Sequence, residues 1–369
     1  MKNIFKLLTV LIVLQGCSKD PVSFDESSVD ALDNWPAQNF TETYQSFMGN
    51  CKVLQKKKGE YLHKNKLFGT LENWKALCHK AEYINNGSIK AFFEDNFALY
   101  KVESQKPSLF TGYYTPTLKG SLLKTAQFNT PLYQKPTDLY SADLGQFYPE
   151  LKGKIIIARL DENNKKFKPY YKRHEIDAFY AEAKPFIWLK SPIDSFFLHI
   201  QGSGYIELPD ERVVHVAYNG SNGHGYKAIG RTLIENGWMK KEDVTMQSLY
   251  QWLESNPEKQ AQVFHSNPRY IFFRESNGKT TGSLGVELTE QGSLAVDPAY
   301  IPLGIPAFVE TTLTYDKTSF QKMLYTQDTG AAIKGGVRGD IFFGKGKKAE
   351  LLSGAQNNEG SLYVFVPKR

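Results

Sequence analysis

The sequence lacks the spacings that mark a bound metal or an acyl-transfer nucleophile. Its seven histidines are scattered over 369 residues, and no CxxC, HExxH or GxSxG motif occurs. Zinc sites and serine-hydrolase sites are normally recognised by such spacings. We therefore expect neither a metal nor an organic cofactor.

No apolar run is long enough to span a bilayer, which takes about 20 residues. The N-terminus instead has two lysines, Lys2 and Lys6, before an apolar run over Leu7–Leu14, and Cys17 follows. This pattern predicts a lipoprotein signal peptide over residues 1–16 with the lipid on Cys17. An incidental cysteine is the alternative. Ser18, in place of Asp, resembles the pattern of lipoproteins sorted to the outer membrane.

The chain also lacks a basic block with interleaved aromatic residues, so no nucleic-acid partner is expected. Its formal net charge is +6, and removal of Lys2 and Lys6 with the signal peptide leaves about +4. The run Lys56–Lys58 reads as a solvated helix surface. This mild surplus could favour an acidic polymer.

Of the 3 cysteines, Cys51 and Cys78 remain once Cys17 is set aside. In an oxidising compartment the pair suggests a disulfide that closes a loop of 27 residues and contributes about 3 kcal/mol. Two buried free thiols are the alternative.

The pattern along the chain is mainly β with helices near the N-terminus. Residues 17–34 are expected to be a tether, and helical spacing predicts three helices over Phe40–Phe97. Short β-type runs follow from residue 107 to the C-terminus, one of them over Ser195–Ile200, in which His199 reads as a core histidine. The sequence predicts further helices over Arg173–Ala183, Gly225–Trp238 and Thr245–Asn256.

Two features could carry chemistry. Asp297, Asp328 and Asp340 each adjoin both a turn signal and a β run, so a compact barrel could bring them together. Neighbouring carboxylates and burial both raise the pKa of an acid, which suits a proton donor in glycosidic cleavage. Acids at turns or strand ends are the alternative. The glycines of Gly202-Ser203-Gly204 could let the backbone approach a ligand, or form a tight turn.

Several strings resemble the membrane-bound lytic murein transglycosylase A family with its C-terminal three-aspartate module. The resemblance covers nearly the whole mature chain and keeps the order of the motifs. The strings are Leu109–Pro116 (LFTGYYTP), Phe197–Gly204 (FLHIQGSG), Asn267–Arg274 (NPRYIFFR), Leu294–Pro298 (LAVDP), Tyr300–Gly304 (YIPLG) and Gln327–Asp340, which opens with QDTG.

The resemblance implies a double-psi β-barrel with an inserted second β-rich domain and a glycan groove between them. Residues 35–115 would hold the helices and first part of the barrel, 116–264 the insert, and 265–369 the second part. It also implies that Asp340 is the catalytic acid and base, that Asp328 supports it, and that Asp297 is structural. The implied substrate-binding residues are Thr111, Tyr113, Tyr114, Gln201, Gly202, Ser203 and Lys334.

The implied reaction is lytic cleavage of the β-1,4 bond between N-acetylmuramic acid and N-acetylglucosamine, which leaves 1,6-anhydromuramoyl ends. The expected partners are peptidoglycan glycan strands and, through the lipid, a membrane. We expect a monomer in the cell envelope, anchored to the outer membrane and facing the periplasm. Two alternatives stay open: a hydrolytic muramidase that uses Asp328 or Glu310 as a second carboxylate, and a lipoprotein that only binds peptidoglycan.

Overall fold

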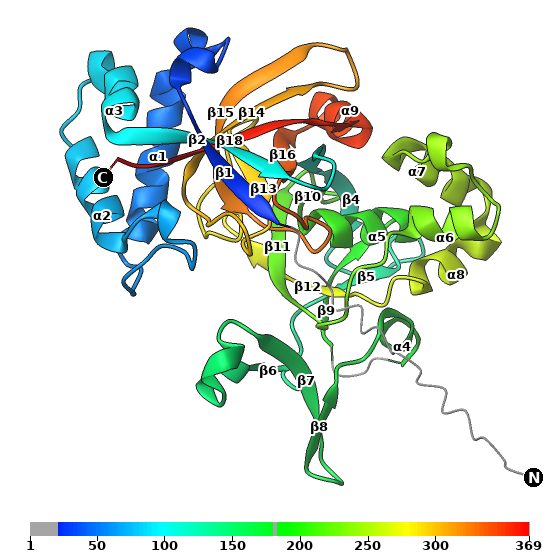
Figure 1. Ribbon diagram of the computed structural model, residues 1–369. Helices are drawn as coiled ribbons and strands as arrows, with labels where there is room; N and C mark the ends of the chain where they lie inside the picture. The colour runs from blue at the N-terminus through cyan, green and yellow to red at the C-terminus, as the bar shows by residue number, and fades with distance from the viewer. Residues whose placement is uncertain (1–20, 180–182, 369) are drawn as a thin grey trace, which may run out of the picture.

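The computed structural model describes residues 21–179 and 183–368, which form three β-sheets flanked by helices (Figure 1). One sheet has nine strands, one has six and one has three. The predicted signal peptide and Cys17 lie outside the described residues. The fold is therefore mixed α/β and rich in strands.

The nine-stranded sheet combines strands from both ends of the chain. Most neighbours are antiparallel, but β3 runs parallel to β16, and β13 runs parallel to β15. Each parallel pair places residues that are separated in the sequence side by side in the sheet. In spatial order its strands are β1 (Val22–Ser27), β2 (Phe97–Ser104), β18 (Gly360–Pro367), β14 (Pro306–Thr312), β15 (Ser319–Asp328), β13 (Ser293–Val296), β16 (Arg338–Lys345), β3 (Leu109–Thr115) and β17 (Asn357–Asn358).

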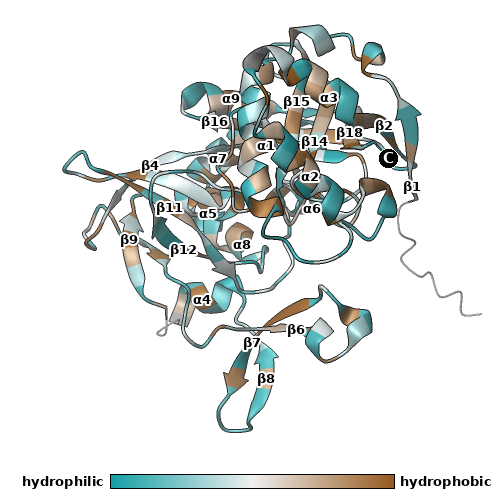
Figure 2. Ribbon diagram, turned by 90° about the vertical axis from the view of Figure 1, so that its left-hand side faces the viewer, coloured by the Kyte–Doolittle hydropathy of each residue, from teal (hydrophilic) through white to brown (hydrophobic). Residues whose placement is uncertain are grey.

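Three N-terminal helices cover one side of this sheet, as the helical spacing predicts (Figure 1). They are α1 (Phe40–Leu54), α2 (Leu71–Ala81) and α3 (Ile89–Asn96). In each helix hydrophilic and hydrophobic segments alternate (Figure 2), and the apolar face packs on the sheet. Phe47 of α1 contacts the rings of Phe92, Phe93 and Phe97, and all four rings are buried.

Residues 22–27, expected to be part of a tether, form the edge strand β1 instead. The strand pairs antiparallel with β2 over its whole length. Phe24 contacts the ring of Phe68 at 5.4 Å, and the next apolar residues, Leu32 and Trp35, are buried. The polar composition hid the strand because only one residue in two of an edge strand needs to be apolar.

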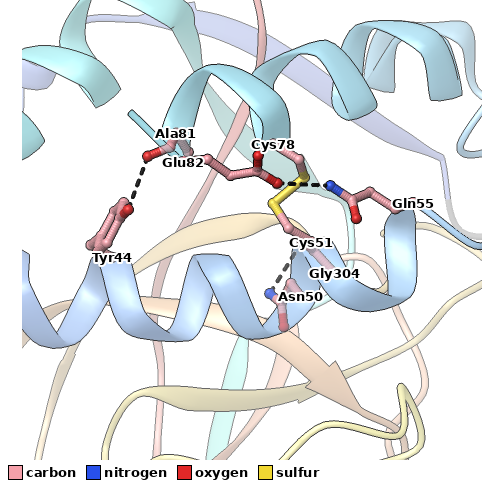
Figure 3. Close-up of a disulfide and its surroundings, with 8 residues drawn as sticks. All are labelled: Tyr44, Asn50, Cys51, Gln55, Cys78, Ala81, Glu82 and Gly304. Atoms are coloured by element: carbon pink, nitrogen blue, oxygen red, sulfur yellow. Dashed lines mark hydrogen bonds between the residues drawn. A yellow bond between two sulfur atoms is a disulfide. The ribbon is translucent and has the colours of Figure 1, made fainter. Parts of the chain in front are cut away.

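Cys51 and Cys78, which the sequence left open as bonded or free, form a disulfide with a Cα–Cα distance of 5.4 Å (Figure 3). The bond joins α1 to α2. Next to it, the Tyr44 hydroxyl donates to the carbonyl of Ala81 at 2.9 Å, also between the two helices. Asn50, buried on α1, donates to the carbonyl of Gly304 at 3.2 Å. These contacts thus hold α1 and α2 together and hold α1 against the segment that contains Gly304.

The six-stranded sheet is built from the middle of the chain. An isolated bridge between Gln134 and Phe273 brings its two edge strands together, so the sheet curls on itself. Strand β12 pairs with β11, and its residues Ile271 and Phe273 lie in the core of the six-stranded sheet. The strands are, in spatial order, β12 (Ile271–Ser276), β11 (Val213–Ser221), β10 (Ser203–Glu207), β4 (Thr117–Ser121), β9 (Pro185–Leu189) and β5 (Thr130–Tyr133).

The predicted strand over Ser195–Ile200 is wrong, because the segment belongs to helix α5 (Pro192–Gln201). Its aromatic and β-branched residues suit a strand, but the ends carry strong helix signals. The Ser191 side chain accepts hydrogen bonds from two backbone N–H groups, Pro192 opens the first turn, and Gly202 closes the helix with φ 83°. His199 is nevertheless buried, and its Nδ1 accepts from the N–H of Ile271 at 3.1 Å.

The other helices flank the six-stranded sheet or the far end of the nine-stranded one (Figure 1). The helix predicted over Gly225–Trp238 is shorter, and the one predicted over Thr245–Asn256 is found almost as expected. They are α4 (Arg173–Phe179), α6 (Ile229–Glu235), α7 (Met246–Ser255), α8 (Gln260–His265) and α9 (Lys347–Ala355).

A small third sheet projects from the six-stranded part of the molecule (Figure 1). Its strands are β6 (Tyr140–Asp143), β7 (Ile155–Asp161) and β8 (Lys166–Pro169). Hydrophobic segments lie along β7 (Figure 2). Among the described residues no helix has the length and apolar character needed to cross a membrane.

Candidate active site

An open cleft of about 620 Å³ lies between the nine-stranded and six-stranded sheets. One wall comes from strands β3, β15 and β16, and the other from α5, β11, β12 and the loops next to them. Its volume lies within the range of about 300–1,000 Å³ that is usual for ligand-binding sites of proteins. Six of the predicted site residues line it: Tyr113, Gln201, Gly202, Ser203, Asp328 and Asp340.

Asp340 lies on β16, where the strand ladder fixes its position. It pairs with Thr111 of the parallel strand β3 and with Ala295 of the antiparallel strand β13. The Thr111 hydroxyl donates to Asp340 Oδ1 at 2.6 Å, and Arg338 Nη2 donates to Thr111 Oγ1 at 2.8 Å. Thr111 thus orients the carboxyl group of Asp340, although it does not line the cleft itself.

Burial raises the pKa of Asp340 to about 6. The hydrogen bond from Thr111 and the charge of Arg338 lower this pKa, while the nearby charge of Asp328 raises it. Loss of hydration has the largest effect on the pKa of Asp340, because a half-buried carboxylate loses more hydration than one hydroxyl group replaces. Asp340 is therefore a carboxyl group that can still carry a proton near neutral pH.

Asp328 sits at the end of β15, and both of its oxygens accept hydrogen bonds. Oδ1 accepts from the N–H and the hydroxyl of Ser283 at 2.8 and 2.7 Å, and from the N–H of Thr329 at 2.8 Å. Oδ2 accepts from the Tyr113 hydroxyl at 3.0 Å. Such donors hold the carboxyl group of Asp328 in place.

Asp297, the third aspartate, does not line the cleft. It is buried, with 6% of its surface exposed. Oδ1 accepts from the N–H of Ala299 and Oδ2 from the N–H of Gly335, each at 3.1 Å. Asp297 thus ties two loops together. The Lys334 side chain is 64% exposed, and its Nζ lies 4.0 Å from Asp297 Oδ1. Lys334 also does not line the cleft.

The two adjacent tyrosines of β3 point in different directions, as expected for a strand. Tyr113 faces the cleft, and burial followed by the charges of Asp328 and Asp340 raises its pKa well above the usual value. It therefore stays a hydrogen-bond donor. Tyr114 packs instead against the core of the nine-stranded sheet, and its N–H donates to Gln201 Oε1 at 3.2 Å.

The cleft residues that sequence reasoning missed include Ser283, Arg173, Arg269 and Arg274. Ser283 lies in the loop after β12, which joins the two sheets, and only its contact with Asp328 reveals a role. Arg269 and Arg274 lie within the string NPRYIFFR, which was used for the resemblance but not for the site. Two arginines that flank a buried strand were the available signal.

Within the described ranges 21–179 and 183–368, no group of three or more His, Cys, Asp or Glu side chains could hold a metal ion. The chemistry available to the described side chains of this cleft is proton transfer by Asp340. The cleft also offers cations and hydroxyls for binding.

Comparisons with known proteins give consistent matches. The family model described as the MltA specific insert domain matches residues 109–274, and the one described as the 3D domain matches residues 292–366. The chain is 30% identical over 381 residues to "Membrane-bound lytic murein transglycosylase A" of Escherichia coli K12, covering 97% of this chain and 93% of the relative.

Solved structures are similar over the same extent. A crystal structure of MltA from Neisseria gonorrhoeae is 31% identical, with 94% of this chain and 93% of that chain covered and a TM-score of 0.77. A membrane-bound lytic murein transglycosylase from Agrobacterium tumefaciens is 28% identical, with 94% and 98% covered and a TM-score of 0.83.

Proposed function

Because the chain belongs to the membrane-bound lytic murein transglycosylase A family, we propose that Asp340 is the single acid and base of its reaction. The protein is a peptidoglycan lytic transglycosylase. The observation that carries the proposal is one carboxyl group with a raised pKa, about 6, that lines the cleft.

The reaction needs the Asp340 carboxyl group twice. In its protonated form it gives the proton to the oxygen that bridges N-acetylmuramic acid and N-acetylglucosamine, and the bond from muramoyl C1 to that oxygen breaks. The resulting Asp340 carboxylate then takes the proton of the muramoyl C6 hydroxyl, whose oxygen bonds to C1. The product has a 1,6-anhydromuramoyl end, Asp340 is protonated again, and no water is consumed.

Asp328 supports this role from β15, which is separated from β16 by β13. Its negative charge raises the pKa of Asp340, while Ser283, Thr329 and Tyr113 occupy its oxygens. An inverting hydrolase would need a second carboxylate free to activate water. Asp328 is poorly placed for that because its donors already hold it. Glu310 lies on β14 outside the cleft, where it accepts from the Tyr363 hydroxyl at 3.1 Å.

Three finer features belong to the same proposal. We infer that the nine-stranded sheet is a double-psi β-barrel; its two parallel pairs support this. We infer that residues 116–264 are the core of the insert, extended by β12. Several relatives are named membrane-bound, which supports a lipid on Cys17, outer-membrane attachment and action on glycan strands facing the periplasm.

The test is mass spectrometry of the muropeptides that the protein releases from peptidoglycan sacculi in ¹⁸O-labelled water. The proposal predicts 1,6-anhydro ends without ¹⁸O, and no such ends from the Asp340→Asn variant. Reducing ends that carry ¹⁸O would mean hydrolysis and contradict the lytic mechanism. Binding to sacculi without release of any product would leave a protein that only binds peptidoglycan.

A further inference from the structure

The wall of the cleft formed by the six-stranded part of the molecule carries three arginines: Arg173, Arg269 and Arg274. None of them forms an ion pair with an acidic side chain among the residues that the structure describes. The two acids of the cleft, Asp328 and Asp340, come from the opposite sheet. We call this set of three the arginine wall.

Arg173 is the deepest member, with 4% of its surface exposed. Its guanidinium carbon lies 4.9 Å from the centres of the Phe196 and Tyr270 rings, and Nη2 donates to the carbonyl of Arg269 at 2.8 Å. Its Nε has no hydrogen-bond partner among the described residues. A buried cation with an unused donor is costly unless an anion compensates it.

Among the described residues, no acidic side chain forms an ion pair with Arg173, although the charge of Asp177 raises the pKa of Arg173. Asp177, on the same helix as Arg173, contacts His265 Nε2 at 3.2 Å instead. His199 also lines the cleft, but burial and the charge of Arg173 lower its pKa well below the usual value, so it is neutral. An anionic group of a bound ligand can therefore supply the partner that Arg173 Nε lacks among the described residues.

Each of the other two guanidinium groups has one hydrogen bond to the described part of the chain, so most of its donors have no partner there. Arg269 Nη1 donates to the carbonyl of His224 at 3.3 Å, and Arg274 Nη1 approaches the carbonyl of Glu275 at 3.5 Å. Each guanidinium has five N–H donors arranged to take a carboxylate through two parallel hydrogen bonds. Arg274 is exposed, lies on β12 and lines the cleft, so a ligand in the cleft can reach it.

We propose that the arginine wall is a subsite for a carboxylate carried by the muramoyl residues of the substrate. The inference rests on the proposed function, since only a muramoyl glycan carries such groups. The carboxylate is that of the lactyl group, where the strand has lost its peptide, or one on the peptide stem. A neutral chitin chain has neither, so the wall makes the enzyme prefer peptidoglycan over other β-1,4 glycans.

The test measures binding without turnover. Calorimetric titration of the full-length Asp340→Asn protein, held in non-ionic detergent, compares three six-sugar ligands: neutral chitohexaose, a peptide-free muramoyl oligosaccharide and the same oligosaccharide with peptide stems. Removing two charge-assisted contacts in Arg269→Gln/Arg274→Gln is expected to lower the preference for the carboxylate ligands over chitohexaose by about tenfold or more.

A matched control removes two arginines outside the cleft. Arg212 and Arg231 are exposed and paired with Asp210 and Glu235, so Arg212→Gln/Arg231→Gln makes the same change in net charge. An equal fall of the preference in this control would mean general electrostatic attraction and overturn the subsite. No preference in the parent, or an unchanged one in Arg269→Gln/Arg274→Gln, would overturn it too.

The ligand arms identify the source of the carboxylate. Preference for the peptide-free oligosaccharide points to the lactyl group, and preference only for the stem-bearing one points to the peptide. If the double variant unfolds at lower temperature, Arg274→Gln alone gives the answer, because that side chain is exposed. These measurements do not depend on the reaction product, so a hydrolytic product would overturn the proposed function while leaving this result readable.

Discussion

The two walls of the cleft are built in different ways. Asp340 and Asp328 are placed by the strand ladder of the nine-stranded sheet, where both pair with Ala295 of β13. The arginines of the other wall reach the cleft from α4, from the segment before β12 and from β12 itself. A backbone register fixes short carboxyl groups to within a fraction of an ångström, whereas long side chains adapt to a ligand. The comparison assigns chemistry to one wall and recognition to the other.

The largest effect is expected for a substitution of Asp340, in the wall formed by the nine-stranded sheet. Asp340→Asn should lower the rate of anhydro-end formation about a thousandfold, the scale of lost general acid–base catalysis. Folding should not suffer, because the raised pKa means that the ionised carboxyl costs stability above about pH 6. The measurement is product formation beside thermal unfolding at pH 7. Asp316→Asn, an exposed aspartate in the β14–β15 turn, is the matched control; an equal loss there would remove the special role of Asp340.

The second effect concerns the disulfide that joins α1 to α2, two helices that cover the nine-stranded sheet. Replacing Cys51 and Cys78 with serine opens a loop of 27 residues and should cost about 3 kcal/mol of unfolding free energy. Hydrogen exchange should rise in α1, α2 and the strands that they cover, more than in the six-stranded sheet. An equal rise of hydrogen exchange in both sheets would show that the nine-stranded and six-stranded sheets unfold together.

A smaller effect tests how Asp328 is held. Ser283→Ala removes the hydroxyl that donates to Asp328 Oδ1 but keeps the backbone donor, so a loss of about 1 kcal/mol, or about fivefold in kcat, is expected. The KM should change little, because the proposed role of Ser283 is to hold Asp328 and not to bind the substrate. Ser28→Ala, an exposed serine outside the cleft, controls for a lost hydroxyl. A rise in KM with unchanged kcat would show instead that Ser283 binds the substrate.

The smallest effect is a shift in pH dependence. The Thr111 hydroxyl lowers the pKa of Asp340, so Thr111→Val should raise it and move the alkaline limb of kcat/KM to higher pH, by less than about one unit. The sign follows because the donor stabilises the carboxylate more than the acid. A shift to lower pH would contradict the contact. Rates between pH 5 and 8 provide the measurement.

The sequence predicted the parts of this molecule that follow local rules. The three N-terminal helices follow from helical spacing, and the alternation of Tyr113 and Tyr114 follows from the period of a strand. Asp340 was found through the resemblance of its string, while its pKa depends on burial that no local pattern contains. The domain limits implied by the resemblance remain a prediction.

The misses share one physical cause, which is that tertiary context outweighed local composition. β1 is a strand because its few apolar residues meet Phe68 and the sheet. Helix α5 forms because its caps outweigh its aromatic run. The arginine wall was invisible because Arg173 and Arg269, 96 residues apart, look like ordinary surface charges until the fold buries one beside the other.

The most direct test of the central claim is a titration of the Asp340 carboxyl group itself. Carbon-13 NMR of protein labelled at the aspartate carboxyl carbon, with the Asp340→Asn spectrum to assign the signal, gives its pKa, and kcat/KM is followed over the same pH range. The account predicts a pKa near 6 and a rate that falls as pH rises through that value. A carboxyl group that titrates near 4, with full activity well above that pH, would contradict the assignment of Asp340 as the acid.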